Sequence, residues 1–296
     1  MLSTTSETRN TMLTIIITAH REEKTVGRAI EAFLAQALPQ DYELIVVCPD
    51  DETASVVATY ARQNDRIKHL RDHGKGKPAA LNLALCSAAG ELVVLSDGDV
   101  HIGEGAVSTL LVAFRDPQVG AASGRPLSLS PRDTILGYWS HLLVDAGAHR
   151  RRTLRADRGG FLECSGYLYA FRRSLVDNVP EDALAEDGLI SYLIWKQGFR
   201  TVYAPDAVVY VKYPTTYHDW MAQKIRSMGG YAQPYMEGSP GRRSFRSEAI
   251  QGAWSAIKYP HDLRELWWTL LLFVARVHAW LRVWWDVSWR KKPFAE

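Results

Sequence analysis

The sequence predicts an α/β fold, with an open, mostly parallel β-sheet flanked by helices and a C-terminal tryptophan-rich helical extension. Strand-like and helix-like patterns alternate from residue 13 to residue 99, which is typical of parallel strands joined by right-handed crossovers. The run LVVL at 92–95 is continuously apolar and rich in branched residues, as expected of a strand buried on both faces. Seven of the ten tryptophans lie between Trp254 and Trp289, which sets the last segment apart.

The first part of the chain contains alternating strands and helices. Apolar runs predict the strands, helical spacing of apolar residues predicts the helices, and turn residues such as those of HGKGKP separate them. The predicted strands are 13–19, 42–48, 67–71 and 91–99, and the predicted helices are 24–36, 54–63 and 79–89. In such sheets ligands bind beyond the carboxyl ends of the strands, so we expect the site at that edge.

The order of elements is less regular after residue 119. Apolar runs with turn residues predict strands, and apolar residues at helical spacing predict two further helices. The predicted elements are a strand and turn at 119–126, a helix at 134–152, a pair of strands at 161–173, a helix at 183–198 and a strand at 199–214. Residues 237–248 have the composition of a loop.

Composition excludes several classes of protein. The 296 residues, 47% hydrophobic, are enough for one large domain or for a domain with an extension, and a net charge of +2 gives no reason to expect nucleic-acid binding. The three cysteines, Cys48, Cys86 and Cys164, lack metal-binding spacing and indicate a reducing, cytosolic compartment. The polar first ten residues lack the apolar core of a signal peptide.

The strand predicted at 91–99 ends in Asp97-Gly98-Asp99. Side chains alternate along an extended segment, so the two carboxylates can point to the same side, where a Mg²⁺ or Mn²⁺ ion would relieve their repulsion. An alternative is a solvated Asp-Gly turn. Asp50 and Asp51 follow the second strand at the same edge of the sheet, and four acids at one edge favour the metal site.

An ordered set of motifs resembles the family 2 glycosyltransferases, which are inverting enzymes of the GT-A fold. The resemblance covers residues 13–235, and it points to the membrane-associated cellulose synthase-like and exopolysaccharide branch. The motifs are TAHREE (18–23), PDDET (49–53), GKPAALN (76–82), DGD (97–99), ECSGYLYAFRR (163–173), AEDGLISYLIWKQGFR (185–200) and QKIRS (223–227).

The resemblance implies a nucleotide-sugar donor held with Mg²⁺ or Mn²⁺. It makes Asp99 the principal protein ligand of the metal and places Asp97 at the ribose or the metal's water shell. It further implies that the nucleotide is bound by Ala19, Glu22, Asp50, Asp51 and Lys77. For the charged residues the alternative is an exposed loop charge.

The resemblance also implies the residues on the acceptor side. It makes Asp187 the catalytic base, although a carboxylate at a helix start is also favoured as a cap. Glu186, Gln223 and Arg226 would face the acceptor or the diphosphate. Ser227 stands where many polymer-making relatives have a tryptophan, which argues against polymer-type acceptor binding and processivity.

The C-terminal segment predicts helices at a membrane interface. Its longest uncharged run, 266–275, is short for a bilayer span, and Arg276 and Arg282 interrupt the apolar pattern, so a helix lying in the headgroup region fits better. The alternative is a helix that packs on the enzyme's own core or on another subunit. The expected segments are a flexible tail (1–11), a GT-A domain (12–235), an acceptor-side loop (236–248) and amphipathic helices (249–296).

The sequence therefore predicts a metal-dependent inverting glycosyltransferase, peripheral or monotopic on the cytoplasmic face of a membrane. The expected donor is a UDP-sugar, and the expected acceptor is a hydroxyl of a lipid-linked saccharide, a glycolipid or a polysaccharide. Two alternatives are a polyprenyl-phosphate glycosyltransferase and a non-catalytic nucleotide-sugar-binding protein. A nucleotidyltransferase would leave the 185–200 motif unexplained.

Overall fold

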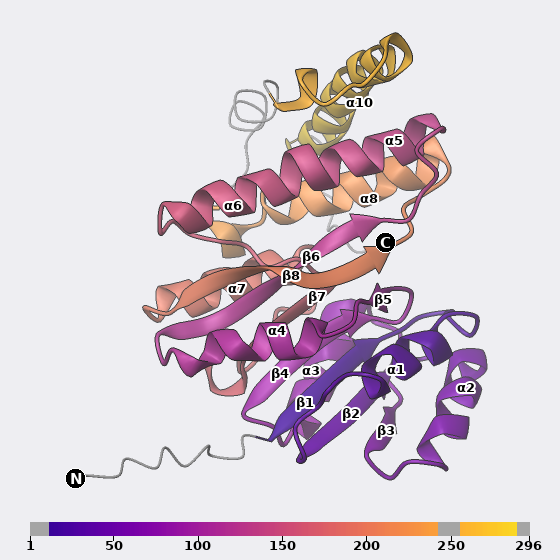
Figure 1. Cartoon of the computed structure of the whole chain (residues 1–296), viewed down its shortest axis with the longest axis vertical. Coiled ribbons are helices and arrows are strands. Elements are labelled where there is room, and N and C mark those ends of the chain that lie inside the picture. The colour runs from indigo at the N-terminus through magenta and orange to yellow at the C-terminus, as the bar shows by residue number, and fades with distance from the viewer. Residues whose placement is uncertain (1–11, 242–254, 289–296) are drawn as a thin grey trace.

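The computed structural model describes residues 12–241 and 255–288 and contains an eight-stranded mixed sheet with helices on both faces (Figure 1). Hydrogen-bonded neighbours run in the order β3-β2-β1-β4-β7-β6-β8-β5. The strands are β1 (Leu13–Thr18), β2 (Tyr42–Val47), β3 (Ile67–Leu70), β4 (Leu92–Asp97), β5 (His101–Ile102), β6 (Val119–Ser128), β7 (Leu168–Arg172) and β8 (Arg200–Val211).

The helices follow the predicted alternation in the first half of the chain and then form a separate layer. They are α1 (Val26–Leu34), α2 (Asp51–Ala61), α3 (Lys77–Ser87), α4 (Ala106–Val112), α5 (Ile135–Leu142), α6 (Arg150–Asp157), α7 (Glu186–Lys196), α8 (Tyr217–Gly230) and α10 (Leu263–Ser288). A π-helical stretch, Leu143–His149, joins α5 to α6, so the two form one continuous rod in Figure 1.

Strand direction differs between the two halves of the sheet. The neighbours β3, β2, β1 and β4 are all parallel, as expected of buried apolar runs. β7 is antiparallel to both β4 and β6. Only β7 forms from the predicted strand pair at 161–173, because the backbone of residues 163–166 is hydrogen bonded to side chains of other elements instead of to a strand.

Side-chain alternation along the strands builds two cores. Ile15 and Ile17 of β1 pack on one face of the sheet with α1, α2 and α4, whereas Ile16 packs on the other face with α3 and α7. Apolar side chains on both faces of β1 therefore bury the strand between two layers of helices.

A third core joins α5, α8 and α10. Tyr138 and Trp139 of α5 and Trp220 of α8 are buried against Leu272 and Ala279 of α10. Figure 1 shows this layer at the end of the molecule opposite α2. The C-terminal helix therefore packs on the chain's own core along one face, which is the predicted alternative to membrane contact.

The helix α10 is longer than its uncharged run suggested. By length and composition alone, the 23 residues Leu263–Trp285 could cross a membrane, with a mean hydropathy of 1.2, a criterion that core helices of soluble proteins also meet. Several predicted features lie outside the described residues, namely the 1–11 tail, residues 242–248 of the expected loop, residues 249–254 and residues 289–296.

Candidate active site

A cavity of about 1150 Å³ opens at the carboxyl ends of β1 and β4 and extends to the α5, α6, α8 and α10 layer. Nine of the eleven predicted site residues line it, namely Ala19, Glu22, Lys77, Asp97, Asp99, Glu186, Asp187, Gln223 and Arg226. The topology explains this convergence, because parallel strands end at the same edge and the start of α7 lies across from them.

The Asp97-Gly98-Asp99 turn lies directly against the end of β1. Thr18 pairs with Asp97 in the sheet, its hydroxyl donates to Asp97 Oδ1 at 3.4 Å, and the Gly98 N–H donates to the Thr18 carbonyl at 3.0 Å. Desolvation in the cavity wall, and then the charge of Asp97, raise the pKa of the Asp99 carboxyl. The Asp99 carboxylate is therefore in a place where a cation would be favourable.

Lys77 joins two elements of the site. Its ammonium lies 2.6 Å from Asp97 Oδ1 and 2.9 Å from Glu186 Oε1. Burial alone would lower the pKa of Lys77, but the two carboxylates raise it above its ordinary value. Burial also opposes ionisation of Glu186, yet the Lys77 ammonium holds the pKa of that carboxyl below its ordinary value. The group is thus a charged triad at the centre of the cavity wall.

Glu22 is a buried acid close to Asp97 and Asp99. Its Oε2 is buried without a hydrogen-bond partner among the described residues, and a Cβ at Gly98 would lie only 2.4 Å from that oxygen. Desolvation by burial, followed by the charges of Asp99 and Asp97, raises the pKa of Glu22 to about 8. Three carboxylates therefore converge at one place, and Gly98 is required for their close approach.

This arrangement fits a divalent cation that is bound jointly with a phosphate group. Among the described residues there is no group of three or more His, Cys, Asp or Glu side chains arranged to hold a metal alone. Mg²⁺ usually takes one or two carboxylates and completes its shell with water and substrate phosphates. The orphaned Glu22 oxygen beside Asp97 and Asp99 is the observation that supports a cation here.

Asp187 is held rigidly at the start of α7. Its Oδ2 accepts from the Gly166 N–H at 2.9 Å and its Oδ1 accepts from its neighbour's N–H, that of Gly188, at 2.8 Å. A Cβ at Gly166 would lie 3.2 Å from Asp187 Oδ2, so a glycine suits this close approach. The carboxylate lines the cavity together with Glu186 but is oriented by the 163–166 segment.

Asp50 and Asp51 are not in the cavity wall, unlike the other predicted site residues. Asp50 caps α2 by accepting from the Thr53 N–H and also accepts from the Arg21 N–H. Although burial opposes it, this hydrogen bonding lowers the pKa of Asp50 to about 2. Asp51 is exposed and paired with Arg71 at 2.7 Å. The helix begins at Asp51 and not at residue 54, because Asp50 is an N-cap.

Several cavity residues were not predicted. Gln223 donates to the Tyr167 hydroxyl at 3.3 Å, and Tyr167 packs edge-on against Tyr213, so these aromatic rings support α8 beside the acids. Burial, followed by the charge of Asp97, raises the pKa of Tyr167 to about 12. Asp72, after β3, is 8% exposed and also lines the cavity. Tyr167 lies within the ECSGYLYAFRR motif, but no spacing rule gave it a role.

Comparisons with known proteins agree with this architecture. Residues 10–230 match the family model described as "Glycosyltransferase like family 2". An N-acetylglucosaminyltransferase of Rhizobium meliloti (strain 1021) is 29% identical over 236 residues, which cover 72% of this chain and 54% of that protein. A poly-beta-1,6-N-acetyl-D-glucosamine synthase of Staphylococcus aureus (strain COL) is 26% identical over 229 residues, 74% of this chain and 54% of that protein. This chain thus spans about half the length of these curated relatives.

A solved structure shares the fold over nearly the whole chain. It is the mannosyltransferase PcManGT from Pyrobaculum calidifontis in complex with GDP-Man and Mn²⁺, with a TM-score of 0.68 and 22% sequence identity. The similarity covers 96% of this chain and 89% of that one. The predicted GT-A fold is therefore confirmed, together with a C-terminal helix beyond the sheet.

Proposed function

The chain belongs to the glycosyltransferase-like family 2, and on this premise we propose that it transfers a sugar, with inversion, from a nucleotide-diphosphate donor to a hydroxyl acceptor. The proposal rests chiefly on one observation. Acids from the ends of β1 and β4 meet in one cavity wall with the charged triad of Lys77 and with Asp187, a carboxylate whose orientation is fixed by two backbone N–H groups.

The proposed roles follow from charge and position. Asp99, with Asp97 and Glu22 beside it, would hold Mg²⁺ or Mn²⁺, which supplies charge neutralisation for the diphosphate as it leaves. Asp187 accepts the proton of the attacking hydroxyl, while the acceptor oxygen bonds to the anomeric carbon and the bond from that carbon to the diphosphate breaks. Arg226, which lines the same cavity, faces the diphosphate as a guanidinium donor.

The Lys77 triad keeps this machinery in place. Its ammonium fixes Asp97 beside the metal position and simultaneously fixes Glu186, the residue before the proposed base. The donor and acceptor sides are thereby linked through one side chain. The similar proteins suggest donor candidates: the names of the curated relatives contain the sugar N-acetylglucosamine, and the solved structure contains GDP-Man. The base expected from the sequence is uracil, so UDP-sugars come first.

A donor screen tests the proposal. Nucleotide release is measured from a panel of UDP- and GDP-sugars with Mn²⁺, with Mg²⁺ and with EDTA, for the wild type and for Asp187→Asn. We expect metal-dependent release from one donor and its loss in Asp187→Asn. Asp177→Asn is the matched control, because Asp177 is exposed and does not line the cavity.

The other outcomes separate the alternatives. An acceptor phosphate needs no strong base, so release that survives in Asp187→Asn but not in Asp99→Ala would indicate a polyprenyl-phosphate glycosyltransferase. Nucleotide binding without release from any donor, in the presence of membrane lipids, would indicate a binding protein.

We further propose that the enzyme works at a membrane surface through α10, on the cytoplasmic side where nucleotide sugars are made.

A further inference from the structure

Charges are segregated along the cavity. The six acids of its wall, Glu22, Asp72, Asp97, Asp99, Glu186 and Asp187, all come from the sheet edge or the start of α7. Of the described stretch from Leu142 to Arg158, the residues that line the cavity include five arginines and no acid, because Asp145 and Asp157 are not in the wall. The donor and its metal occupy the acidic side in the proposed function, so the basic side is available for a second, anionic molecule.

The arginines in and directly after α6 differ in their exposure and in their contacts. Arg152 is 7% exposed and donates to the carbonyls of Glu163 and Cys164, so it holds the fold together. Arg155 lies 3.8 Å from the buried Glu163 carboxylate with its side chain still 28% exposed. Arg158, after the end of α6, is exposed at the cavity. Arg155 and Arg158 therefore present guanidinium donors to a ligand, and guanidinium groups suit phosphate oxygens.

Part of the wall of the same cavity is apolar. Leu143 and Leu154 line it from the α5–α6 rod, and Phe273, Val277 and Trp280 line it from α10. Val277 is 42% exposed although it is a branched apolar side chain, so part of this wall lacks an apolar partner in the described chain. A soluble sugar would leave this apolar surface in contact with water, whereas a hydrocarbon chain would remove it from water.

A short segment connects the basic wall to the proposed base. Arg152 binds the carbonyls of residues 163 and 164, the Cys164 N–H donates to Ser191 of α7, and the Gly166 N–H donates to Asp187. Residues 163–166 are thus bonded to α6 on one side and to α7 on the other. A molecule held on α6 would therefore be positioned by the same segment that orients Asp187.

We propose that the acceptor is a saccharide carried by a lipid phosphate: an amphiphile whose phosphate binds Arg155 and Arg158 and whose hydrocarbon chain lies along Phe273, Val277 and Trp280. This inference rests on the proposed function and names its acceptor class. The hydroxyl that attacks the donor belongs to the saccharide that such a lipid carries, near Asp187. Phosphate and chain are both needed, because the wall contains both kinds of contact.

Binding of three probes to the full-length protein, measured without donor, tests the proposal. Farnesyl phosphate has both parts, farnesol has the chain alone and inorganic phosphate has the anion alone. Equilibrium dialysis below the micelle concentration should give farnesyl phosphate an affinity at least roughly tenfold above that of either other probe, the scale expected for losing a charge-assisted contact. Arg155→Gln and, separately, Arg158→Gln should weaken farnesyl phosphate but not farnesol.

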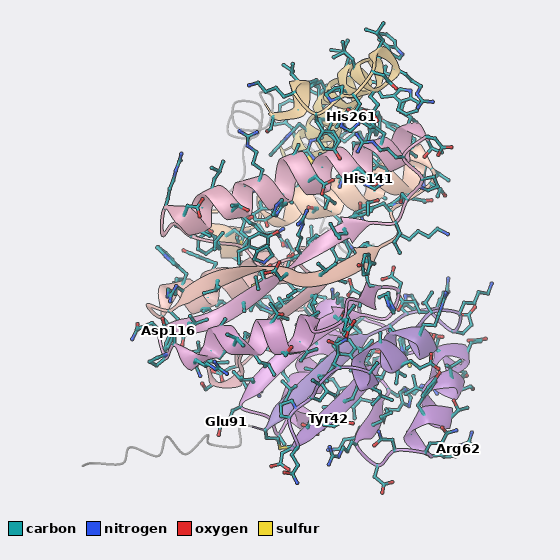
Figure 2. All side chains as sticks on the ribbon, in the orientation of Figure 1. Tyr42, Arg62, Glu91, Asp116, His141 and His261 are labelled. Atoms are coloured by element: carbon teal, nitrogen blue, oxygen red, sulfur yellow. The ribbon has the colours of Figure 1, made fainter. Side chains whose placement is uncertain are left out.

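Matched variants serve as controls. Arg62→Gln removes the arginine that directly follows α2, and Figure 2 shows Arg62 far from His141 on α5. Val277→Asn should weaken farnesyl phosphate but not inorganic phosphate, whereas Val274→Asn should do neither, because Val274 is 66% exposed on α10 and does not line the cavity. Arg158 is exposed, so Arg158→Gln also guards against a folding defect in Arg155→Gln.

Three results would overturn the proposal. Equal affinity for inorganic phosphate would mean a free-anion site, equal affinity for farnesol would mean a purely apolar groove, and insensitivity to both arginine variants would mean that the phosphate binds elsewhere. Binding of UDP and of GDP with Mn²⁺ is measured in the same samples. Nucleotide binding without farnesyl phosphate binding would reject the lipid phosphate and leave the proposed function standing, whereas the reverse would reject the proposed function.

Discussion

The ammonium of Lys77 lies 2.9 Å from the carboxylate of Glu186, so the first residue of α3 is ion-paired with the first residue of α7. The two helices come from chain segments more than a hundred residues apart and pack on the same face of the sheet. The pair is partly enclosed, with 24% of the Lys77 side chain and 11% of the Glu186 side chain exposed. The ion pair therefore joins the start of α3 to the start of α7 in the cavity wall.

Lys77→Gln should destabilise the fold as well as impair the site. The substitution leaves Asp97 and Glu186 without their shared cation, and losing one member of an enclosed ion pair costs about 3 kcal/mol in the free energy of unfolding. Urea unfolding measures this change. Lys75→Gln is the control, because Lys75 is exposed two residues away. Equal unfolding midpoints for the two variants would contradict the structural role.

Asp99→Asn should remove the metal dependence of nucleotide binding. Its carboxylate lies in the wall beside Asp97 and Glu22. Desolvation and then the charge of Asp97 raise the pKa of Asp99, and a bound cation would stabilise its charged form. Titration of Mn²⁺ into protein with UDP should show a loss of about a hundredfold in Mn²⁺ affinity, the upper scale for losing a metal-site interaction.

The control for that experiment is Asp51→Asn. Asp51 was predicted at the nucleotide, but it is exposed and paired with Arg71 outside the cavity wall. Its replacement should leave Mn²⁺ affinity unchanged. If Asp51→Asn weakened binding as much as Asp99→Asn, the position of the donor in this cavity would have to be revised.

Glu22 should give the protein a pH-dependent stability. Its pKa is about 8 in the fold against an ordinary value of 4.5, because burial and then Asp99 and Asp97 disfavour its charged form. Its stabilising contribution is therefore fully present below about pH 4.5 and is lost as pH rises to about 8, because the unfolded chain releases the proton first. The free energy of unfolding should fall across this window.

Glu22→Gln isolates this effect from that of other acids. The difference in unfolding free energy between variant and wild type should grow from pH 5 to pH 8, since the amide has no proton to lose. Glu23→Gln, at the neighbouring position outside the cavity wall, is the control and should leave the slope unchanged. Parallel slopes for the wild type and Glu22→Gln would show that Glu22 ionises normally in the fold.

Local sequence patterns were sufficient for the parallel half of the fold. The apolar runs of β1, β2 and β4 place both faces in a core, and strand direction then brings Thr18 and Asp97 together without any knowledge of distant contacts. The inserted strand β7 and the irregular 163–166 segment were harder, because hydrogen bonds to α6 and α7 decide their conformation. Such long-range partners leave no periodic signal.

The position of Asp50 and Asp51, which were predicted to bind the nucleotide, also depends on contacts that the local sequence does not reveal. Asp50 and Asp51 follow a strand end, as a ligand-binding residue would, but an aspartate there is equally suited to cap the next helix. The Arg21 N–H, brought near by folding, completes that capping arrangement and occupies Asp50 Oδ2. The arginines of α6 that line the cavity show this limit too, because the long-range contacts of α6, such as the hydrogen bonds of Arg152 to the carbonyls of Glu163 and Cys164, leave no local signal.

The outer face of α10 should carry the membrane affinity. Trp267 is 58% exposed, Leu270 49% and Trp284 56%, and none of them lines the cavity or belongs to the buried core with α5 and α8. Removing the whole helix would expose Tyr138 and Trp139 and so confuse unfolding with release. Replacing the three outer residues with glutamine keeps Leu272 and Ala279 in place and avoids that problem.

The triple variant Trp267→Gln, Leu270→Gln and Trp284→Gln should move the protein from the floating vesicle fraction to the dense bottom fraction in flotation with anionic vesicles, because an interfacial helix binds through its buried apolar area and its tryptophans. The control is Val112→Gln, at an apolar side chain that is 53% exposed on α4, a helix that packs on the sheet and not in the core with α10. Sedimentation without vesicles addresses the remaining alternative. If the wild type is a dimer that the triple variant converts to a monomer, and flotation is unchanged, this face of α10 contacts a second subunit and not the membrane.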